Sequence, residues 1–442
     1  MNDGGTFMQQ NASDVTLYVT TMEVTTITPL QFFSASDMYK GQRYFWQNRE
    51  ATLTIVGVGN VLTLTGTDNR FNEIEKQWKA IHIHANQEQP ILFGGVTFDQ
   101  LNDKKSEWGD FPQALFVVAK YQFIQKGQQC FMNIQSTSPI TAKDQAEAEA
   151  FLAAIKTATI TLEKPKMIAY TEPEKEAYLQ AVKEVTTRIR NKEADKVVLA
   201  RTLALQFENQ VQPAQLIRDL LKEQPDCYIY GLEFGQRFFT GASPERLVRV
   251  AKHHAYSACV AGSIKRGVTA AEDEVLGYTL LHDDKNGGEH QHVVDMIADT
   301  FKAHCTTYKV PKQPQLLKSR DIQHLYTPVE GVLKAQKTIL QLAKDLHPTP
   351  ALGGVPRNKA MAIIRQHEAM NREMYASPIG WLDTTGDGEF AVALRCALIH
   401  DKQAYLYAGG GIVADSEPQS EYEETLVKFR PMLRALGGDL HE

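Results

Sequence analysis

Three short strand patterns follow one another near the C-terminus, and the joints between them have hairpin length. The patterns are PIGWLD (378–383), EFAVALRCALI (389–399) and AYLYAGGG (404–411). Strands joined this closely pair as antiparallel neighbours, because a parallel crossover needs a much longer connection. This stretch therefore favours an antiparallel sheet over the βαβ alternation of a parallel one.

Strand and helix patterns alternate irregularly through the rest of the chain. Strand patterns occur at 52–59, 114–124, 130–136, 196–207, 227–235, 237–241, 245–250 and 255–262. Helical patterns occur at 71–85, 142–158, 172–193, 270–283, 289–304, 335–345 and 357–372. Antiparallel strands with interspersed helices indicate the α+β fold class. A connector at 162–175 separates residues 1–165, expected to be structural, from residues 166–442, which carry the candidate chemistry.

Composition excludes several classes of protein. The 442 residues carry a net charge of −6 without a basic block, so we expect no nucleic-acid partner and no membrane partner. Five scattered cysteines without a C-x-x-C pair predict reduced thiols rather than disulfides or a zinc site. The polar first ten residues do not resemble a secretory signal, and no run approaches the roughly 18 apolar residues that span a bilayer. We therefore expect a cytoplasmic protein.

The segment 405–433 combines the three glycines at 409–411 with a patterned helix. An S-x-x-E pair at 420–423 is typical of a capping box and predicts a helix that starts at Glu421. Glu421, Glu424 and Lys428 then share one helix face, separate from the apolar stripe. Paired carboxylates suit a hard divalent cation such as Mg²⁺, and free glycine amides suit an anion. The alternative is a solvated Glu/Lys face stabilised by i,i+4 pairs.

Four further charged residues stand where a purely structural role is one of two interpretations. Lys196 opens an apolar strand, so it is either a desolvated base or a lysine at an exposed strand end. Glu245 follows a proline in GASPERL and is either a fixed general acid or an edge-strand glutamate. Glu289 begins a helix, as a cation ligand or as an acid favoured by the helix dipole. Arg395 lies within an apolar strand, where it needs a carboxylate partner or an anionic ligand.

Together these motifs resemble the chorismate-utilising enzymes and, within them, the isochorismate synthases. The resemblance covers about residues 190–435 and includes DKVVLAR (195–201), FFTGASPERL (238–247), VAGSIKRG (260–267), DDKNGGEHQHVVD (283–295), IQHLYTP (322–328), HPTPALGG (347–354) and YAGGGIVADSEPQSEYEETLVK (407–428). It implies a single large α+β body in which two antiparallel β-sheets are stacked face to face with helices outside.

The resemblance implies that a Mg²⁺ ion anchors the ring carboxylate of the substrate, chorismate. Glu289 and Glu424 match the direct metal ligands, and Glu421 matches a carboxylate that supports the ion through water. Lys428 would face the same carboxylate, together with the amides of three glycines, namely Gly409, Gly410 and Gly411.

The remaining matched positions would bind or convert the substrate. Lys196 matches the base that activates water for attack at C2, and Glu245 matches the acid that protonates the departing C4 hydroxyl. Tyr375 and Arg395 match the residues that hold the enolpyruvyl carboxylate. The further substrate-binding residues implied by the motifs are Ser263, His324 and Thr327.

Two positions distinguish the branches of the family. Members that add an amine carry Gln at the position of Lys196, and one such branch has a lysine nucleophile at the position of Ala261. Water is therefore the expected nucleophile, and no amidotransferase subunit is expected. Salicylate synthase, which shares the lysine, stays an alternative, although IQHLYTP favours isochorismate synthase. Menaquinone supply is favoured over siderophore supply, and the protein is expected to be a monomer or a homodimer.

Overall fold

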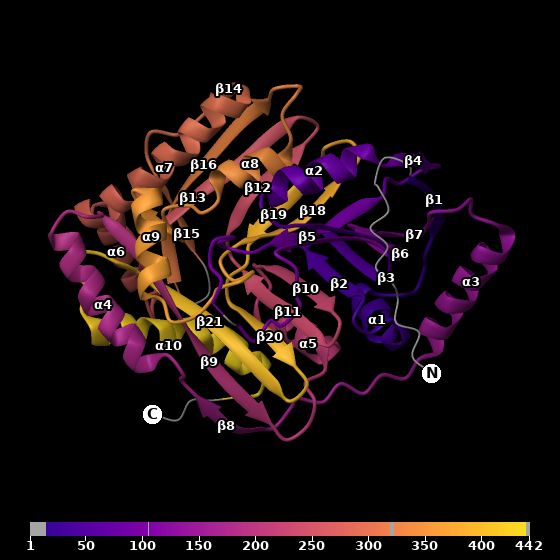
Figure 1. Cartoon of the computed structure of the whole chain (residues 1–442), viewed down its shortest axis with the longest axis horizontal. Helices are drawn as coiled ribbons and strands as arrows, with labels where there is room; N and C mark the ends of the chain where they lie inside the picture. The colour runs from indigo at the N-terminus through magenta and orange to yellow at the C-terminus, as the bar shows by residue number, and fades with distance from the viewer. Residues whose placement is uncertain (1–14, 105, 319–321, 439–442) are drawn as a thin grey trace.

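Antiparallel strand pairing organises the whole molecule, as expected from the sequence. The computed structural model describes residues 15–104, 106–318 and 322–438. Figure 1 shows strands running through the centre and helices placed around them. The α+β class is confirmed.

The first of two sheets contains strands from both halves of the chain. In spatial order it consists of β8 (Met167–Thr171), β9 (Lys196–Phe207), β21 (Gln403–Ile412), β20 (Cys396–His400), β11 (Arg237–Ser243), β10 (Tyr228–Phe234), β2 (Arg43–Gln47), β3 (Leu53–Gly66), β6 (Ala114–Lys126), β7 (Gln129–Ser136), β1 (Thr16–Glu23) and β4 (His82–Ala85). The short β17 (Gly354–Val355) also pairs with β9. All these pairings are antiparallel except that of β1 with β4.

The second sheet branches from β6. It consists of β5 (Ile91–Val96), β18 (Pro378–Asp383), β19 (Gly388–Val392), β12 (Arg246–Ala251), β13 (His254–Lys265) and β16 (Ile322–Leu333), with β14 (Cys305–Lys309) and β15 (Gln315–Lys318) on its edge. One end of β6 pairs with β5 and the other with β7, so this strand of 13 residues belongs to both sheets.

Helices cover the sheets. They are α1 (Pro29–Ser34), η2 (Asp37–Tyr39), α2 (Arg70–Ala80), α3 (Ala142–Thr157), α4 (Lys175–Arg190), α5 (Pro213–Glu223), α6 (Ala270–Leu281), α7 (Asp284–His304), α8 (Ile339–Leu346), α9 (Arg357–His367) and α10 (Pro418–Ala435). Helix α10 packs on β21, α4 and α9 pack on β9, and α7 packs on β13 and β16. These three strand regions carry most of the candidate site.

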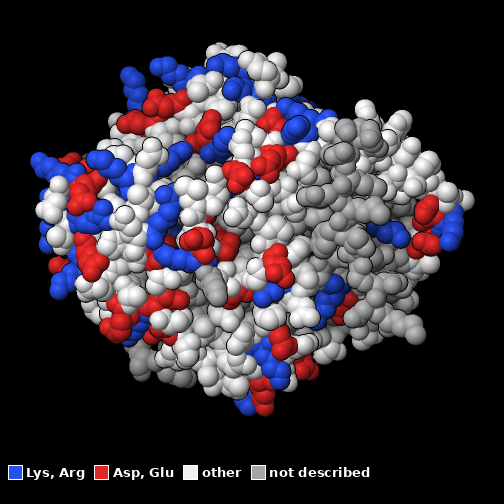
Figure 2. Space-filling view, in the orientation of Figure 1, with Lys and Arg blue, Asp and Glu red and all other residues white. Residues whose placement is uncertain are grey.

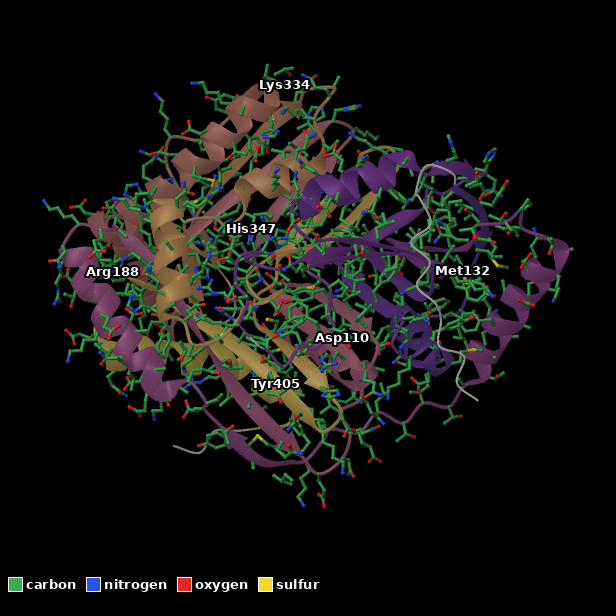
Figure 3. The ribbon with its side chains drawn as sticks, viewed as in Figure 1. Asp110, Met132, Arg188, Lys334, His347 and Tyr405 are labelled. Atoms are coloured by element: carbon green, nitrogen blue, oxygen red, sulfur yellow. The ribbon has the colours of Figure 1, made fainter. Side chains whose placement is uncertain are left out.

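The apolar core is divided into two clusters. The larger contains buried residues of both sheets, such as Leu199 of β9 and Phe390 of β19. The smaller lies between the first sheet and α1, α3, α5 and α10, and includes Leu203 and Phe429. Figure 3 shows side chains filling these spaces, with His347 near the centre of the view. The two ends of β9 contribute to different clusters, because Val197, Leu199 and Ala200 belong to the larger cluster, whereas Leu203, Leu205 and Phe207 belong to the smaller one.

Several predicted elements differ from the observed ones. The predicted connector 162–175 contains strand β8, and α7 begins at Asp284 and not at Glu289. The predicted helix 71–85 ends at Ala80, because His82–Ala85 form β4 and pair with β1. The predicted capping box is wrong, since α10 begins at Pro418 with Glu417 as its N-cap. The predicted strand 389–399 is interrupted, because β19 ends at Val392 and β20 begins at Cys396.

Several expectations concern the molecule as a whole. None of the helices in the described ranges is long and apolar enough to cross a membrane. Lys and Arg side chains are interspersed with Asp and Glu over the face in Figure 2, as the small net charge suggests. All five cysteines are free thiols. The first ten residues, interpreted above as lacking a secretory signal, lie outside the described residues.

Candidate active site

Lys196 and Glu289, far apart in sequence, meet at the start of β9. Lys196 is only 8% exposed, and its Nζ donates a hydrogen bond to Oε1 of Glu289 near the beginning of α7. The lysine stem crosses Gly411 so closely that a Cβ there would lie 2.5 Å from Lys196 Cε. Of the two interpretations of Lys196, the structure thus shows the buried side chain and not the exposed strand end, and glycine at 411 makes room for it.

Glu245 lies in the short connection between β11 and β12. Its backbone N–H donates to Ser243 Oγ at 3.2 Å and its carbonyl accepts from Val392 N–H at 3.1 Å. No described residue donates a hydrogen bond to its half-buried carboxyl group. Burial raises the pKa of Glu245 to about 7, and the positive charges of Arg395 and Lys196 oppose this shift. The carboxyl group can therefore carry a proton near neutral pH, as a general acid must.

Arg395 occupies a turn, and not the strand centre that the sequence suggested. Its φ of 48° lies in the left-handed region, and its carbonyl accepts from Ala242 N–H at 3.2 Å. The half-buried guanidinium forms no hydrogen bond or ion pair with the described residues, although burial lowers the pKa of Arg395. A partly desolvated cation without a protein partner is suited to an anionic ligand. Tyr375 is 4% exposed, and the Arg395 charge affects its pKa, so the two groups are neighbours.

The predicted polar face of α10 points at the glycines of β21. Lys428 Nζ donates to Glu424 Oε1 at 2.5 Å and to the carbonyl of Gly409 at 2.7 Å. Glu421 accepts from Ser416 Oγ at 2.6 Å, and a Cβ on Gly410 would lie 2.9 Å from Glu421 Oε2. The predicted polar face of α10 is therefore present, and its charged side chains contact other protein groups as well as solvent.

The three glycines lie in strand β21, as the strand pattern 404–411 predicts. Gly409, Gly410 and Gly411 pair with Ala200, Leu199 and Val198 of β9. On the other edge, β21 pairs with β20 only as far as Tyr407. Within the described chain, no strand pairs with this edge beyond Tyr407, which leaves backbone groups beside Arg395 and Lys428 for a ligand.

The residues proposed from VAGSIKRG and IQHLYTP lie across the β13–β16 pair. Ser263 Oγ is 2.7 Å from His324 Nδ1. Burial, together with the charges of Arg395 and Lys428, lowers the pKa of His324 to about 4, so the ring is neutral near pH 7. Thr327 is 2% exposed, and its Oγ1 is 2.7 Å from Nε2 of His290, the residue after Glu289. Thr327 thus contacts the helix segment behind the site, and its contact with substrate stays a prediction.

Three carboxylates, Glu289, Glu421 and Glu424, are implied to hold Mg²⁺. In the described ranges no group of three His, Cys, Asp or Glu side chains is close enough to hold a metal ion. Lys196 and Lys428 pair with Glu289 and Glu424 instead. The donor type nevertheless fits, because carboxylate oxygens suit Mg²⁺. Burial and the adjacent Glu424 charge raise the pKa of Glu421, and a bound cation would relieve that repulsion.

Tyr178 of α4 was not a candidate site residue from the sequence, but its hydroxyl reaches the site. The side chain is 3% exposed, and the hydroxyl has no hydrogen-bond partner among the described residues. A Cβ on Gly410 would lie 3.7 Å from it, so it shares a space with Glu421. Burial and the Glu421 charge raise the pKa of Tyr178, which makes it a neutral donor. A tyrosine on an otherwise aliphatic stripe was the available signal.

The chain is similar to known proteins over nearly its full length. The family model described as "Chorismate binding enzyme" matches residues 6–437. Isochorismate synthase MenF of Bacillus subtilis is 39% identical over 94% of this chain and 93% of that protein. The salicylate biosynthesis isochorismate synthase of Pseudomonas aeruginosa is 36% identical over 96% and 91%. The structure of MenF, the menaquinone-specific isochorismate synthase from Escherichia coli, gives a TM-score of 0.82 at 26% identity and covers 95% and 94%. The chain therefore belongs to the chorismate binding enzyme family, in the group that contains the isochorismate synthases.

Proposed function

We propose that the protein is a Mg²⁺-dependent isochorismate synthase that converts chorismate reversibly to isochorismate, for menaquinone biosynthesis. The similarity to isochorismate synthase MenF of Bacillus subtilis over nearly the full length of both chains supports the reaction, and the similarity to the menaquinone-specific enzyme of Escherichia coli supports the pathway. The observation that carries this proposal is that a candidate base and a candidate acid lie in the same site. A buried lysine and a carboxyl group with a pKa near 7 lie within electrostatic reach of each other.

The proposed reaction exchanges one hydroxyl group for another. Lys196, in its neutral form, accepts a proton from water as the water oxygen bonds to C2 of the ring. The ring double bonds shift, the C4–O bond breaks, and Glu245 donates a proton so that the hydroxyl leaves as water. The net proton transfer from Glu245 to Lys196 is reversed in the opposite reaction, which uses Glu245 as base and Lys196 as acid.

The substrate carries two negative charges. Its binding would rely on positively charged side chains whose charge the protein does not fully neutralise. The Arg395 guanidinium, together with the Tyr375 hydroxyl, would hold the enolpyruvyl carboxylate by charge-assisted hydrogen bonds. Glu289, Glu424 and, through water, Glu421 would hold Mg²⁺, which neutralises the ring carboxylate. Lys428 would supply further positive charge beside the open edge of β21.

A first experiment incubates the purified protein with chorismate and Mg²⁺, with and without EDTA, and separates products by chromatography. We expect isochorismate in equilibrium with chorismate, loss of turnover with EDTA, and no pyruvate. Lys196→Ala should lower kcat by about 10²–10⁴-fold, the usual contribution of a general base. Lys183→Ala on the exposed face of α4 is the matched control and should keep the wild-type rate. Absence of isochorismate would refute the proposal.

A second candidate is supply of isochorismate for salicylate formation. It is favoured by the 36% identity to the salicylate biosynthesis isochorismate synthase of Pseudomonas aeruginosa over 96% of this chain. Deletion of the gene distinguishes the two pathways, because a menaquinone role predicts loss of menaquinone, restored by wild-type enzyme and not by Lys196→Ala. Release of pyruvate and salicylate by the pure protein would instead assign salicylate synthase.

A further inference from the structure

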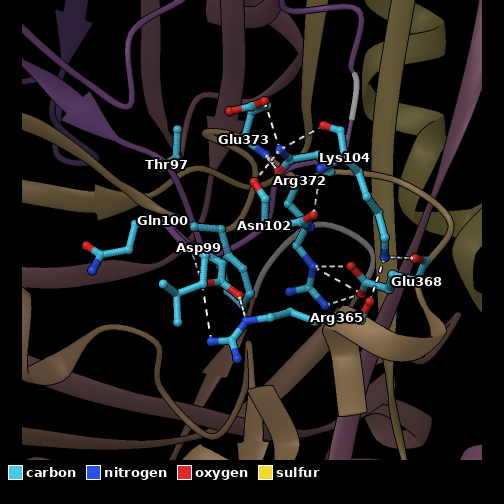
Figure 4. A network of polar contacts seen from close by, with 12 residues as sticks. Thr97, Asp99, Gln100, Asn102, Lys104, Arg365, Glu368, Arg372 and Glu373 are labelled. Atoms are coloured by element: carbon cyan, nitrogen blue, oxygen red, sulfur yellow. Dashed lines mark hydrogen bonds and ion pairs between the residues drawn. The ribbon is translucent and has the colours of Figure 1, made fainter. Parts of the chain in front are cut away.

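A segment of the N-terminal half contacts the catalytic half behind the candidate site. The described parts of the connection between β5 and β6, residues 97–104 and 106–113, lie against the residues that precede Tyr375. Ser106 Oγ donates to Glu373 Oε1 at 2.9 Å, and Asn371 Nδ2 donates to the carbonyl of Lys104 at 3.3 Å. Lys104 Nζ also donates to the carbonyl of Glu368 (Figure 4). No candidate site residue was predicted in this half, yet it supports the loop that carries a proposed substrate contact.

Within the connection, Glu107 forms a defined contact with the first sheet. The hydroxyl of Tyr407, on β21, donates a hydrogen bond to Oε1 of Glu107. The hydroxyl oxygen of Tyr407 also accepts a hydrogen bond from Nε1 of Trp108 at 2.8 Å. Trp108 is 1% and Tyr407 is 2% exposed. The Tyr407 hydroxyl therefore has both a donor and an acceptor partner, which fixes the orientation of its ring.

Tyr407 transmits that orientation to the site by stacking. Its ring centroid lies 5.5 Å from that of Tyr375, with an angle of 19° between the ring planes. Stacking alone lets two rings slide, whereas a hydrogen bond at the far edge of one ring restricts that movement. Tyr375 and Arg395 are the residues proposed to hold the enolpyruvyl carboxylate. Glu107 thus lies at the end of a continuous series of contacts that leads to the proposed substrate contact.

We propose that Glu107 is a positioning residue for the anionic substrate, which fixes Tyr375 through Tyr407. The proposal rests on the proposed function, because it takes Tyr375 as a substrate contact. Burial of the Glu107 carboxylate costs free energy, since burial raises the pKa of Glu107. An apolar side chain would fill the same space without that cost. A bond to that carboxylate nevertheless restrains the phenol more strongly than a bond to a neutral acceptor would.

The test uses variants that separate hydrogen bonding from packing. Tyr407→Phe keeps the ring and removes the hydroxyl, Glu107→Ala removes the acceptor, and Glu107→Gln keeps an acceptor. For the full-length enzyme, we expect Glu107→Ala and Tyr407→Phe each to raise KM for chorismate about fivefold to tenfold, with kcat within about twofold. Glu107→Gln, which keeps a weaker neutral acceptor, should raise KM less than Glu107→Ala does. The double variant Glu107→Ala/Tyr407→Phe should be no worse than either single one.

Controls separate this proposal from the proposed function and from loss of folding. Glu163→Ala, an exposed carboxylate in the connector, should leave KM unchanged. Melting temperatures identify a variant that fails to fold, and Tyr407→Phe then carries the test because it keeps the packing. If Tyr375→Phe raises KM while Glu107→Ala and Tyr407→Phe do not, this proposal is wrong and the proposed function stands. If wild-type enzyme makes no isochorismate, the proposed function fails first.

Discussion

Glu245 shows how the pKa that suits its proposed role as general acid also carries a cost in stability. Its carboxyl group is half-buried without a hydrogen-bond partner among the described residues, and burial raises its pKa to about 7. As the proposed general acid it must be protonated in the free enzyme while Lys196 is neutral, so the pH dependence of kcat/KM should show a break near pH 7, where Glu245 ionises. Steady-state kinetics between about pH 5.5 and 9 measure this. Glu245→Gln should lose turnover at every pH, and a wild-type profile without a break near pH 7 would contradict the assignment.

Glu245→Gln should also stabilise the folded protein at high pH. Because the folded-state pKa is raised from 4.5 to about 7, the folded state holds this proton more tightly than the unfolded state. Stability is therefore lost as pH rises from about 4.5 to 7, by up to about 3 kcal/mol. Glu245→Gln should raise the unfolding midpoint at pH 8 and have little effect at pH 4. An equal effect at both pH values would show that packing, and not ionisation, explains it.

At this scale, the sequence predicted residue types better than it predicted partners. Lys196 could be placed facing inward from strand alternation, because its neighbours in β9 are apolar. The contact of Lys196 with Glu289 could not be predicted, because spacing along the chain does not place α7 beside β9. Glu107 gave no signal at all, since it lies in a polar connection without periodicity. Its partner Tyr407 lies 300 residues away, and only tertiary structure brings them together.

Single elements are held in place by buried polar pairs, of which Arg372 and Glu368 are an example. They are 1% and 3% exposed and form an ion pair, with Glu368 Oε1 also accepting from Ala200 N–H at 2.8 Å. Arg372 Nη2 donates to the carbonyl of Val198 at 2.8 Å, and Nη1 donates to that of Leu352 at 2.9 Å. The pair thus fixes β9 against the segment that leads to Tyr375 (Figure 4).

Removing one partner of this pair should cost far more than removing an exposed salt bridge. Arg372→Met leaves Glu368 buried without its counter-charge, so we expect a loss of about 3–5 kcal/mol in urea unfolding. Adding Glu368→Gln should restore part of that loss because it removes the uncompensated charge. Lys79→Met, which breaks the more exposed pair with Glu75, should cost about 1 kcal/mol or less. Equal losses in the two single variants would contradict this account.

The predicted ends of helices and strands were wrong where tertiary contacts outweighed the local sequence pattern. The segment His82–Ala85 continued a helical pattern, but β1 offers a parallel partner and the chain becomes a strand. The predicted start of α10 was wrong because Pro418, at the first helical position, is as good a start signal as the S-x-x-E pair. By contrast, helix 142–158 and the hairpin of 114–124 with 130–136 were predicted nearly to the residue, since their signals are local.

At the scale of the molecule, the predicted division at residue 165 does not separate two independent bodies. Strand β2 pairs with β10, and β5 pairs with β18, so strands of the first half are central neighbours of strands in the second. The resemblance already implied that both halves form one body, although the motifs lay almost entirely after residue 190. The N-terminal half gave no motif because its contribution is strand pairing and support, which many sequences can provide.

This interleaving predicts that the motif-bearing half cannot work alone. Residues 166–442 without residues 1–165 would leave the edges of β10 and β18 unpaired and their apolar faces partly uncovered. We expect that fragment to lack a cooperative unfolding transition by circular dichroism and to convert no chorismate. Co-expression of residues 1–165 should restore both properties, because β2 and β5 can then pair with β10 and β18. A fragment 166–442 that unfolds cooperatively and turns over chorismate at the full-length rate would show that the first half is dispensable for the active site.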